Sequence, residues 1–126
     1  MEQEYNKDIK LDTGKSRYTS IEHRSAETIR IDHPTSSYGI FCFNSDGDLF
    51  LNSDWGFYGY AWRSYDGTFK EFLAQCNTQY IVGKFCITYI EVTGKKLNQT
   101  RKGNLEILVR EFIEYLKKNL SGKSDK

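Results

Sequence analysis

The sequence has little proline and cysteine, and it has no long apolar run. A single proline and ten glycines among 126 residues are too few for a disordered, low-complexity chain. No stretch approaches the roughly 20 apolar residues of a membrane span, and the charges within residues 1–11 argue against a signal peptide. We therefore expect one cytoplasmic domain over residues 1–126, with residues 1–12 and 121–126 as loose ends.

Metal-binding and redox motifs are missing as well. The three cysteines, Cys42, Cys76 and Cys86, are scattered and form no C-x-x-C pair, which argues against a zinc ribbon or a dithiol centre. The two histidines, His23 and His33, form neither H-x-x-x-H nor H-E-x-x-H. We expect free thiols in a reducing compartment, no metal and no cofactor.

No nucleophile motif or phosphate-binding motif is present either. The patterns G-x-S-x-G and G-x-x-x-x-G-K do not occur. Asp32 precedes His33, but neighbours on a strand point to opposite faces and do not pair easily. The sequence therefore favours a protein that is not an enzyme. A small enzyme such as a nuclease, using Asp32, His33 or Glu91, remains an open alternative.

The charge is nearly balanced but unevenly distributed. The chain has 18 basic and 17 acidic residues, a net charge of +1, which argues against a nucleic-acid mimic and a histone-like binder. Residues 1–94 hold 9 basic and 13 acidic groups, a net charge of −4, whereas residues 95–126 hold 9 and 4, a net charge of +5. The basic segment predicts contact with phosphate groups through Lys95, Lys96, Arg101 and Lys102. The alternative is a solvated helix with a lysine-rich tail.

The spacing of apolar residues predicts a sheet in the first half of the chain. Residues 27–33 alternate as a half-buried strand does, and residues 38–44 and 48–53 form a hairpin around Asp46-Gly47. Residues 55–65 predict a further strand of the same meander.

Two amphipathic helices are predicted in the second half. Thr68 and Glu71 form a capping box before a helix that ends near Asn77, and Asn104 precedes a helix over residues 105–120. Residues 80–92 are rich in β-formers, which favours a strand, although a helix remains an open alternative for residues 85–92. Residues 95–103 predict a loop. The expected fold is α+β: an antiparallel meander sheet of four to five strands, with two helices packed on one face.

Aromatic residues supply the candidate contact surface. The chain has 9 Tyr, 8 Phe and 2 Trp, and ten of these aromatic residues lie between residues 38 and 65. On the strand at 55–65, Tyr58, Tyr60 and Trp62 share one face, with Arg63 beside them, and could stack bases or anchor a protein partner. The alternative is that they cover the core. Trp55 and Phe57, on the opposite face, are expected to pack in the core.

Three segments together resemble a group of small proteins from phages and mobile elements. Residues 47–63 contain W-G-x-Y-x-x-x-W, residues 69–73 read F-x-x-F-L, and residues 80–85 contain Y-x-x-G-K. The resemblance covers about a third of the chain and implies a phage setting, but no activity. Small phage proteins often bind host machinery, as anti-CRISPR and other anti-defence proteins do.

These observations lead to one main functional hypothesis. The chain is expected to be a binding protein that inhibits or modulates a host nucleic-acid-handling complex, with a CRISPR effector as the first candidate. The partner would then be a host protein or nucleoprotein, with possible contact to RNA or single-stranded DNA phosphates and none to a membrane. The alternative is an autonomous single-stranded nucleic-acid binder.

Overall fold

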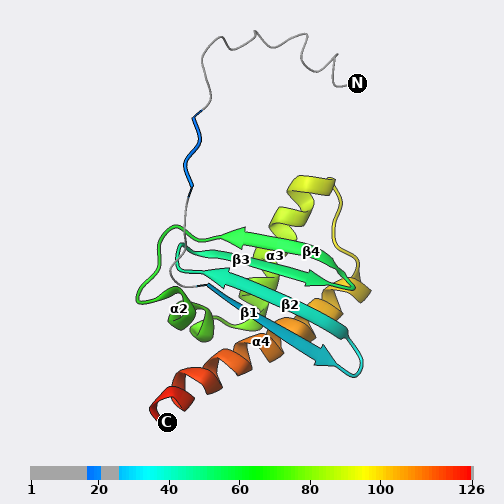
Figure 1. Ribbon diagram of the computed structural model, residues 1–126. Helices are drawn as coiled ribbons and strands as arrows, with labels where there is room; N and C mark the ends of the chain where they lie inside the picture. The colour runs from blue at the N-terminus through cyan, green and yellow to red at the C-terminus, as the bar shows by residue number, and fades with distance from the viewer. Residues whose placement is uncertain (1–16, 21–25, 126) are drawn as a thin grey trace.

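The computed structural model describes residues 17–20 and 26–125 and contains one four-stranded sheet and three helices (Figure 1). The strands form an antiparallel meander in the order β1-β2-β3-β4. The expected α+β class and its meander sheet are therefore confirmed. The elements are β1 (Ala26–His33), β2 (Ser37–Asn44), β3 (Asp48–Ser53), β4 (Gly56–Ala61), α2 (Phe69–Gln75), α3 (Thr78–Thr93) and α4 (Gln99–Asp125).

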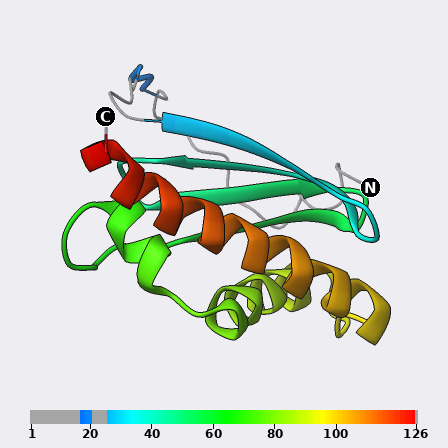
Figure 2. The same ribbon diagram turned by 90° about the horizontal axis from the view of Figure 1, so that it is seen from below.

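All three helices lie on the same side of the sheet (Figure 2). The helix α4 crosses β1 and β2 and contacts both other helices, whereas α3 lies under β4. Alternate residues of each strand point toward these helices, as the pleat requires. The side chains that are fully buried in this layer come from the sheet and from all three helices: Phe41, Leu49, Leu51, Leu73, Ile81, Val82, Phe85, Leu105, Leu108, Val109, Phe112 and Leu116.

The β2–β3 turn has the geometry expected of Asp46-Gly47. Gly47 has a φ of 96°, a value that favours glycine. The Asn44 side-chain oxygen accepts hydrogen bonds from the backbone amides of Asp46, at 2.8 Å, and Asp48, at 3.2 Å. The Gly47 carbonyl accepts a bond from the amide of Trp62 at 2.8 Å. This last bond connects the turn to the chain just beyond β4, which ends at Ala61, before the predicted end at residue 65.

The strand predicted over residues 80–92 is wrong, because these residues belong to the helix α3. The Asn77 side-chain oxygen accepts a hydrogen bond from the amide of Tyr80 at 2.8 Å, so Asn77 begins this helix instead of only ending α2. Gly94 ends it with a φ of 74°. Apolar residues occur on every side of α3, and such a sequence has no helical stripe to distinguish it from a buried strand.

The helix α4 is longer than its apolar stripe predicted. It begins at Gln99, where the Asn98 side-chain oxygen accepts a bond from the Arg101 amide at 2.8 Å. Asn104 is therefore not a cap. Its side chain instead donates to the Thr100 carbonyl one turn earlier, at 2.8 Å. The predicted loop over 95–103 is thus mostly helix, and the helix continues beyond residue 120 to Asp125.

Candidate binding groove at the sheet edge

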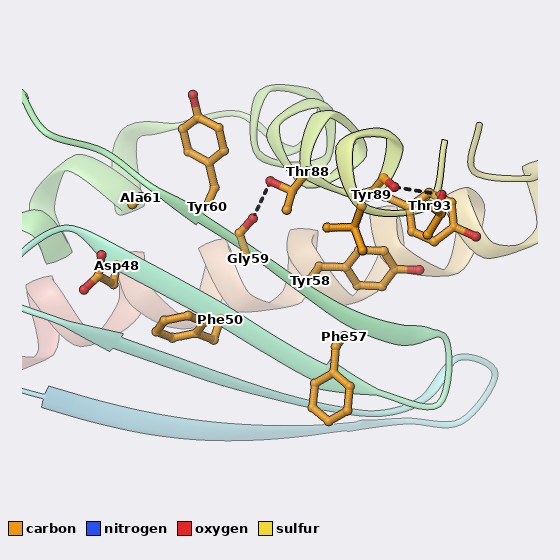
Figure 3. Close-up of a pocket in the computed structure, with 11 residues that line it drawn as sticks. Asp48, Phe50, Phe57, Tyr58, Gly59, Tyr60, Ala61, Thr88, Tyr89 and Thr93 are labelled. Carbon is orange, nitrogen blue, oxygen red and sulfur yellow. Dashed lines mark hydrogen bonds between the residues drawn. The ribbon is translucent and has the colours of Figure 1, made fainter. Parts of the chain in front are cut away.

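A groove of about 650 Å³ runs along the free edge of β4, where this strand meets the C-terminal half of α3 (Figure 3). Its lining combines side chains from both faces of the sheet with one side of the helix. The lining residues are Asp48, Phe50, Phe57, Tyr58, Gly59, Tyr60, Ala61, Thr88, Tyr89, Val92 and Thr93.

Three large apolar side chains of the groove are open to solvent. Phe57 is 78% exposed, Phe50 is 55% exposed and Val92 is 78% exposed. Asn52 pairs with Phe57 and Phe50 pairs with Gly59, so the two phenylalanines are diagonal neighbours on β3 and β4. Their neighbours along the strands, Leu51 and Tyr58, are buried under the helices, so by alternation Phe50 and Phe57 lie on the opposite face of the sheet (Figure 3). Rigid strands therefore present an aromatic surface to solvent.

Two of the three aromatic residues predicted to meet a partner are buried instead. Tyr58 is 5% exposed and Trp62 is 6% exposed. The Tyr58 ring lies 5.9 Å from that of Phe85 on α3, between ring centroids. The Trp62 indole N–H donates a hydrogen bond to the Tyr80 hydroxyl at 3.0 Å. Both side chains belong to the core, which was the alternative interpretation of this strand face.

The prediction of which face of β4 is exposed is therefore wrong. Phe57, which was expected in the core, is the most exposed residue of β4, because the helices cover the opposite face. Both faces of β4 carry aromatic residues, so alternation alone could not decide which one the helices cover. Trp55 is half-buried, and its indole N–H donates to the Ser36 carbonyl at 2.8 Å.

Tyr60 and Arg63 each contact a charged residue from outside the basic segment. Tyr60 is half-buried, and the Lys84 ammonium lies 5.1 Å from its ring centroid, a cation–π contact. The Arg63 guanidinium is exposed and pairs with the Asp48 carboxylate at 3.5 Å. Tyr60 and Asp48 both line the groove, so these two predicted contact residues border the end of it that is nearer Ala61.

The basic segment reaches the other end of the groove through Arg101. Its guanidinium lies 3.5 Å from the Tyr89 hydroxyl, and the Tyr89 ring centroid is 6.0 Å from that of Tyr58. Burial raises the pKa of the Tyr58 phenol, and the Arg101 charge acts in the opposite direction. Lys95 and Lys96 follow α3 directly and are exposed. Arg101 is thus a residue of the basic segment that the structure brings to the groove.

The edge of β4 is closed to a further strand at its centre. The Thr88 hydroxyl donates a hydrogen bond to the Gly59 carbonyl at 2.8 Å, so this outward-facing acceptor is already satisfied (Figure 3). A side chain at Gly59 would press on the Phe50 ring, at 3.2 Å from its Cβ. The groove therefore suits the insertion of side chains better than the addition of a strand.

The residues considered for enzymatic chemistry are not brought together. The Asp32 carboxylate accepts from Arg30 at 3.1 Å, and the His33 Nδ1 accepts from the amides of Thr35 and Ser36, both at 3.1 Å. Glu91 lies on α3, which packs against β4 at the opposite edge of the sheet from β1. In the part of the chain that the structure describes, no three His, Cys, Asp or Glu side chains form a group that could hold a metal ion.

The thiols are free and partly buried. Burial raises the pKa of the Cys76 thiol from 9.0 to about 11, and its Sγ donates to the Phe72 carbonyl at 3.3 Å. Burial also raises the pKa of Cys86, against which the charge of Lys102 acts. A raised thiol pKa leaves little thiolate near neutral pH, so these two cysteines are weak nucleophiles.

Comparison with known proteins gives one family. A family model described as a phage family matches residues 19–122, which include all the segments that resemble phage and mobile-element proteins. No curated protein and no solved structure matches the chain. Over the described residues, none of the helices is both long and apolar enough to cross a membrane.

Proposed function

The chain belongs to this phage family, and from that membership we propose that it is a non-enzymatic binding protein that inhibits or modulates a host nucleic-acid-handling defence complex. The contact surface in this proposal is the groove along β4, with Arg101 and the exposed lysines after α3 at one end. A CRISPR effector is the first target to test, because such a complex presents both protein surface and nucleic-acid phosphates.

The observation that supports the proposal most directly is the exposure of Phe57 and Phe50 beside the groove. Contact of an exposed phenylalanine with water is unfavourable, and its burial in a partner contributes about 25 cal/mol for each Å² of apolar surface. Aromatic side chains held on a rigid element lose little conformational entropy on binding, so they often dominate the energy of an interface. The two phenylalanines satisfy both conditions.

The basic residues explain why the proposed target contains nucleic acid. Lys95, Lys96, Arg101 and Lys102 follow the groove along the chain, and Arg101 contacts its lining. A partner that fills the groove with apolar side chains would place its surface near these cations. Guide or substrate phosphates at that surface would then form charge-assisted contacts, which are stronger than neutral hydrogen bonds.

The test is co-purification from the host background with a matched pair of variants. Phe57→Ala removes the most exposed ring of the groove, whereas Tyr115→Ala removes an exposed ring of α4 outside the groove lining. We expect a defence effector in fixed ratio with the wild type and with Tyr115→Ala, and at least about tenfold less with Phe57→Ala. Equal recovery with both variants would contradict the assignment of the groove.

One observation favours a second candidate, an autonomous single-stranded nucleic-acid binder. Arg101 and Tyr89 lie together at the groove, and an aromatic ring beside a guanidinium is a common base-stacking arrangement. This candidate predicts that a labelled oligonucleotide binds the purified protein, with an affinity that falls steeply as salt rises. Absence of binding at low salt would exclude it and leave the first proposal in place.

A further inference from the structure

The helix α3 is apolar on its outer side as well as on its inner side. Its inner side buries Ile81, Val82 and Phe85 against the sheet and α4. On the outer side Tyr80, Ile87 and Ile90 follow one another at helical spacing and are 40%, 44% and 43% exposed. A surface helix normally carries polar residues there, and a helix that is apolar all round is usually covered. This row is called the outer stripe of α3.

The centre of the outer stripe is flat. Gly83 lies between Tyr80 and Ile87 on the same side of the helix, and a Cβ built there would meet nothing within 4 Å. The backbone is therefore open at this position, and a second helix could approach closely. A partner helix with apolar side chains could rest on Gly83 while it contacts Tyr80 and Ile87.

Only two charged residues occur among the sixteen residues of α3, and both border the outer stripe. Lys84 follows Tyr80 by four positions, and Glu91 follows Ile87 by four. They are separated by seven residues, two helical turns, and so they lie on the same flank of the stripe. The midpoint between them lies between Ile87 and Thr88, beside Ile87 in the C-terminal part of the exposed row.

From this arrangement we infer that the outer stripe of α3 binds the same stripe of a second copy of this chain, with the two helices antiparallel. A two-fold axis that passes between the helices at this midpoint, perpendicular to both, places the charged flank of one helix beside the charged flank of the other. It also reverses the order of residues along that flank. Each Lys84 then faces Glu91 of the second copy, and the Ile87 side chains meet near the axis. The surface is complementary to itself, which a symmetric dimer requires.

The dimer leaves the groove accessible. Thr88 and Tyr89, which line the groove, lie on the side of α3 that faces β4, as the bond from Thr88 to Gly59 and the contact between the Tyr89 and Tyr58 rings show. The dimer is thus a property separate from the proposed binding of a host complex. A host helix could also fit an apolar stripe, but it would have no reason to match the symmetric placement of Lys84 and Glu91.

The experiment is sedimentation equilibrium of the full chain over the micromolar range with three charge variants. The wild type is expected at twice the monomer mass of 14.7 kDa. Lys84→Glu and Glu91→Lys each place like charges opposite one another twice per dimer, so each should weaken association at least about tenfold. The double variant Lys84→Glu/Glu91→Lys restores opposite charges and should restore the dimer.

The double variant separates the interface from simple loss of fold. Lys84 also contacts the Tyr60 and Tyr80 rings, at 5.1 Å and 5.3 Å from the ring centroids, so its substitution alone could weaken the monomer. A wild type that stays monomeric throughout would overturn the inference. So would a double variant that is helical by circular dichroism yet dimerises no better than either single variant. Phe57→Ala should dimerise normally, so failure of the groove and failure of the dimer are distinguishable.

Discussion

The rings of Phe41 and Phe112 lie parallel, 5° apart, with their centroids separated by 4.1 Å. Phe41 is on β2 and Phe112 is on α4, so this stack joins the sheet to the helix that lies furthest from it along the chain. Both side chains are fully buried. The Phe43 ring meets the edge of Phe112 at 5.9 Å, which makes Phe112 the point where α4 contacts two inward-facing residues of β2.

Phe112→Ala should therefore be severely destabilising. Removal of a fully buried phenylalanine costs about 3–5 kcal/mol, because the apolar contact is lost and a cavity remains. Urea denaturation followed by tryptophan fluorescence would measure this change. Tyr115→Ala, one turn along the exposed side of α4, should change stability by less than about 0.5 kcal/mol. Similar losses in both variants would contradict the packing described.

The bond between Trp62 and Tyr80 predicts a coupled pair. Tyr80→Phe deletes the acceptor of the buried indole N–H and should cost about 1 kcal/mol. Trp62→Phe should cost more, because its ring also packs against Phe69 and Phe72. A double-mutant cycle at low protein concentration, where self-association does not contribute, should give a coupling of about 0.5–1.5 kcal/mol. Additive losses would show that the bond contributes nothing.

Two glycines should respond to alanine in opposite directions. Gly47 has a positive φ, and a Cβ there would press against the backbone carbonyl of Trp62, so Gly47→Ala should cost at least about 1–3 kcal/mol. Gly103 lies within α4 with open space around the position of a Cβ, and Gly103→Ala should stabilise the protein by about 0.5–1 kcal/mol. Thermal unfolding of the two variants tests both signs.

The thiol of Cys76 predicts a loss of stability in alkaline solution. Its pKa is raised from 9.0 to about 11 by burial, so between these values the folded chain holds a proton that the unfolded chain has released. By linkage, stability is unaffected by this group below pH 9 and falls as pH rises from 9 toward about 11. Urea midpoints should decline less steeply with pH in Cys76→Ala than in the wild type. Identical slopes would contradict the shift.

The sheet was predictable because its signals are local. The alternation of residues 27–33, the Asp46-Gly47 turn and the Thr68–Glu71 capping box each depend on a few neighbouring residues. All three occur in the structure, where the Thr68 hydroxyl accepts from the Glu71 amide at 3.1 Å. Such features depend little on the rest of the fold, so a single sequence is enough to predict them.

The candidate site was only partly predictable, because it depends on which faces the helices cover. The apolar outer side of α3 made residues 80–92 resemble a strand, and the aromatic residues on both faces of β4 hid its exposed side. Tyr58 and Trp62 were therefore predicted to be exposed, although both are buried in the core. Arg101 was selected for its charge alone, and its contact with Tyr89 depends on the turn between α3 and α4.

The position of α4 at the end of this fold has a consequence during synthesis. The sheet is complete in the nascent chain once residue 61 has left the ribosome, but Leu105, Leu108 and Phe112, which cover its inner face, emerge much later. Ser36, in the β1–β2 turn, likewise waits for Asn104, to which its hydroxyl donates at 2.8 Å. For that interval the apolar side of the sheet is open to chaperones and to other nascent chains. The yield of folded protein should therefore depend on how quickly α4 follows the sheet out of the ribosome.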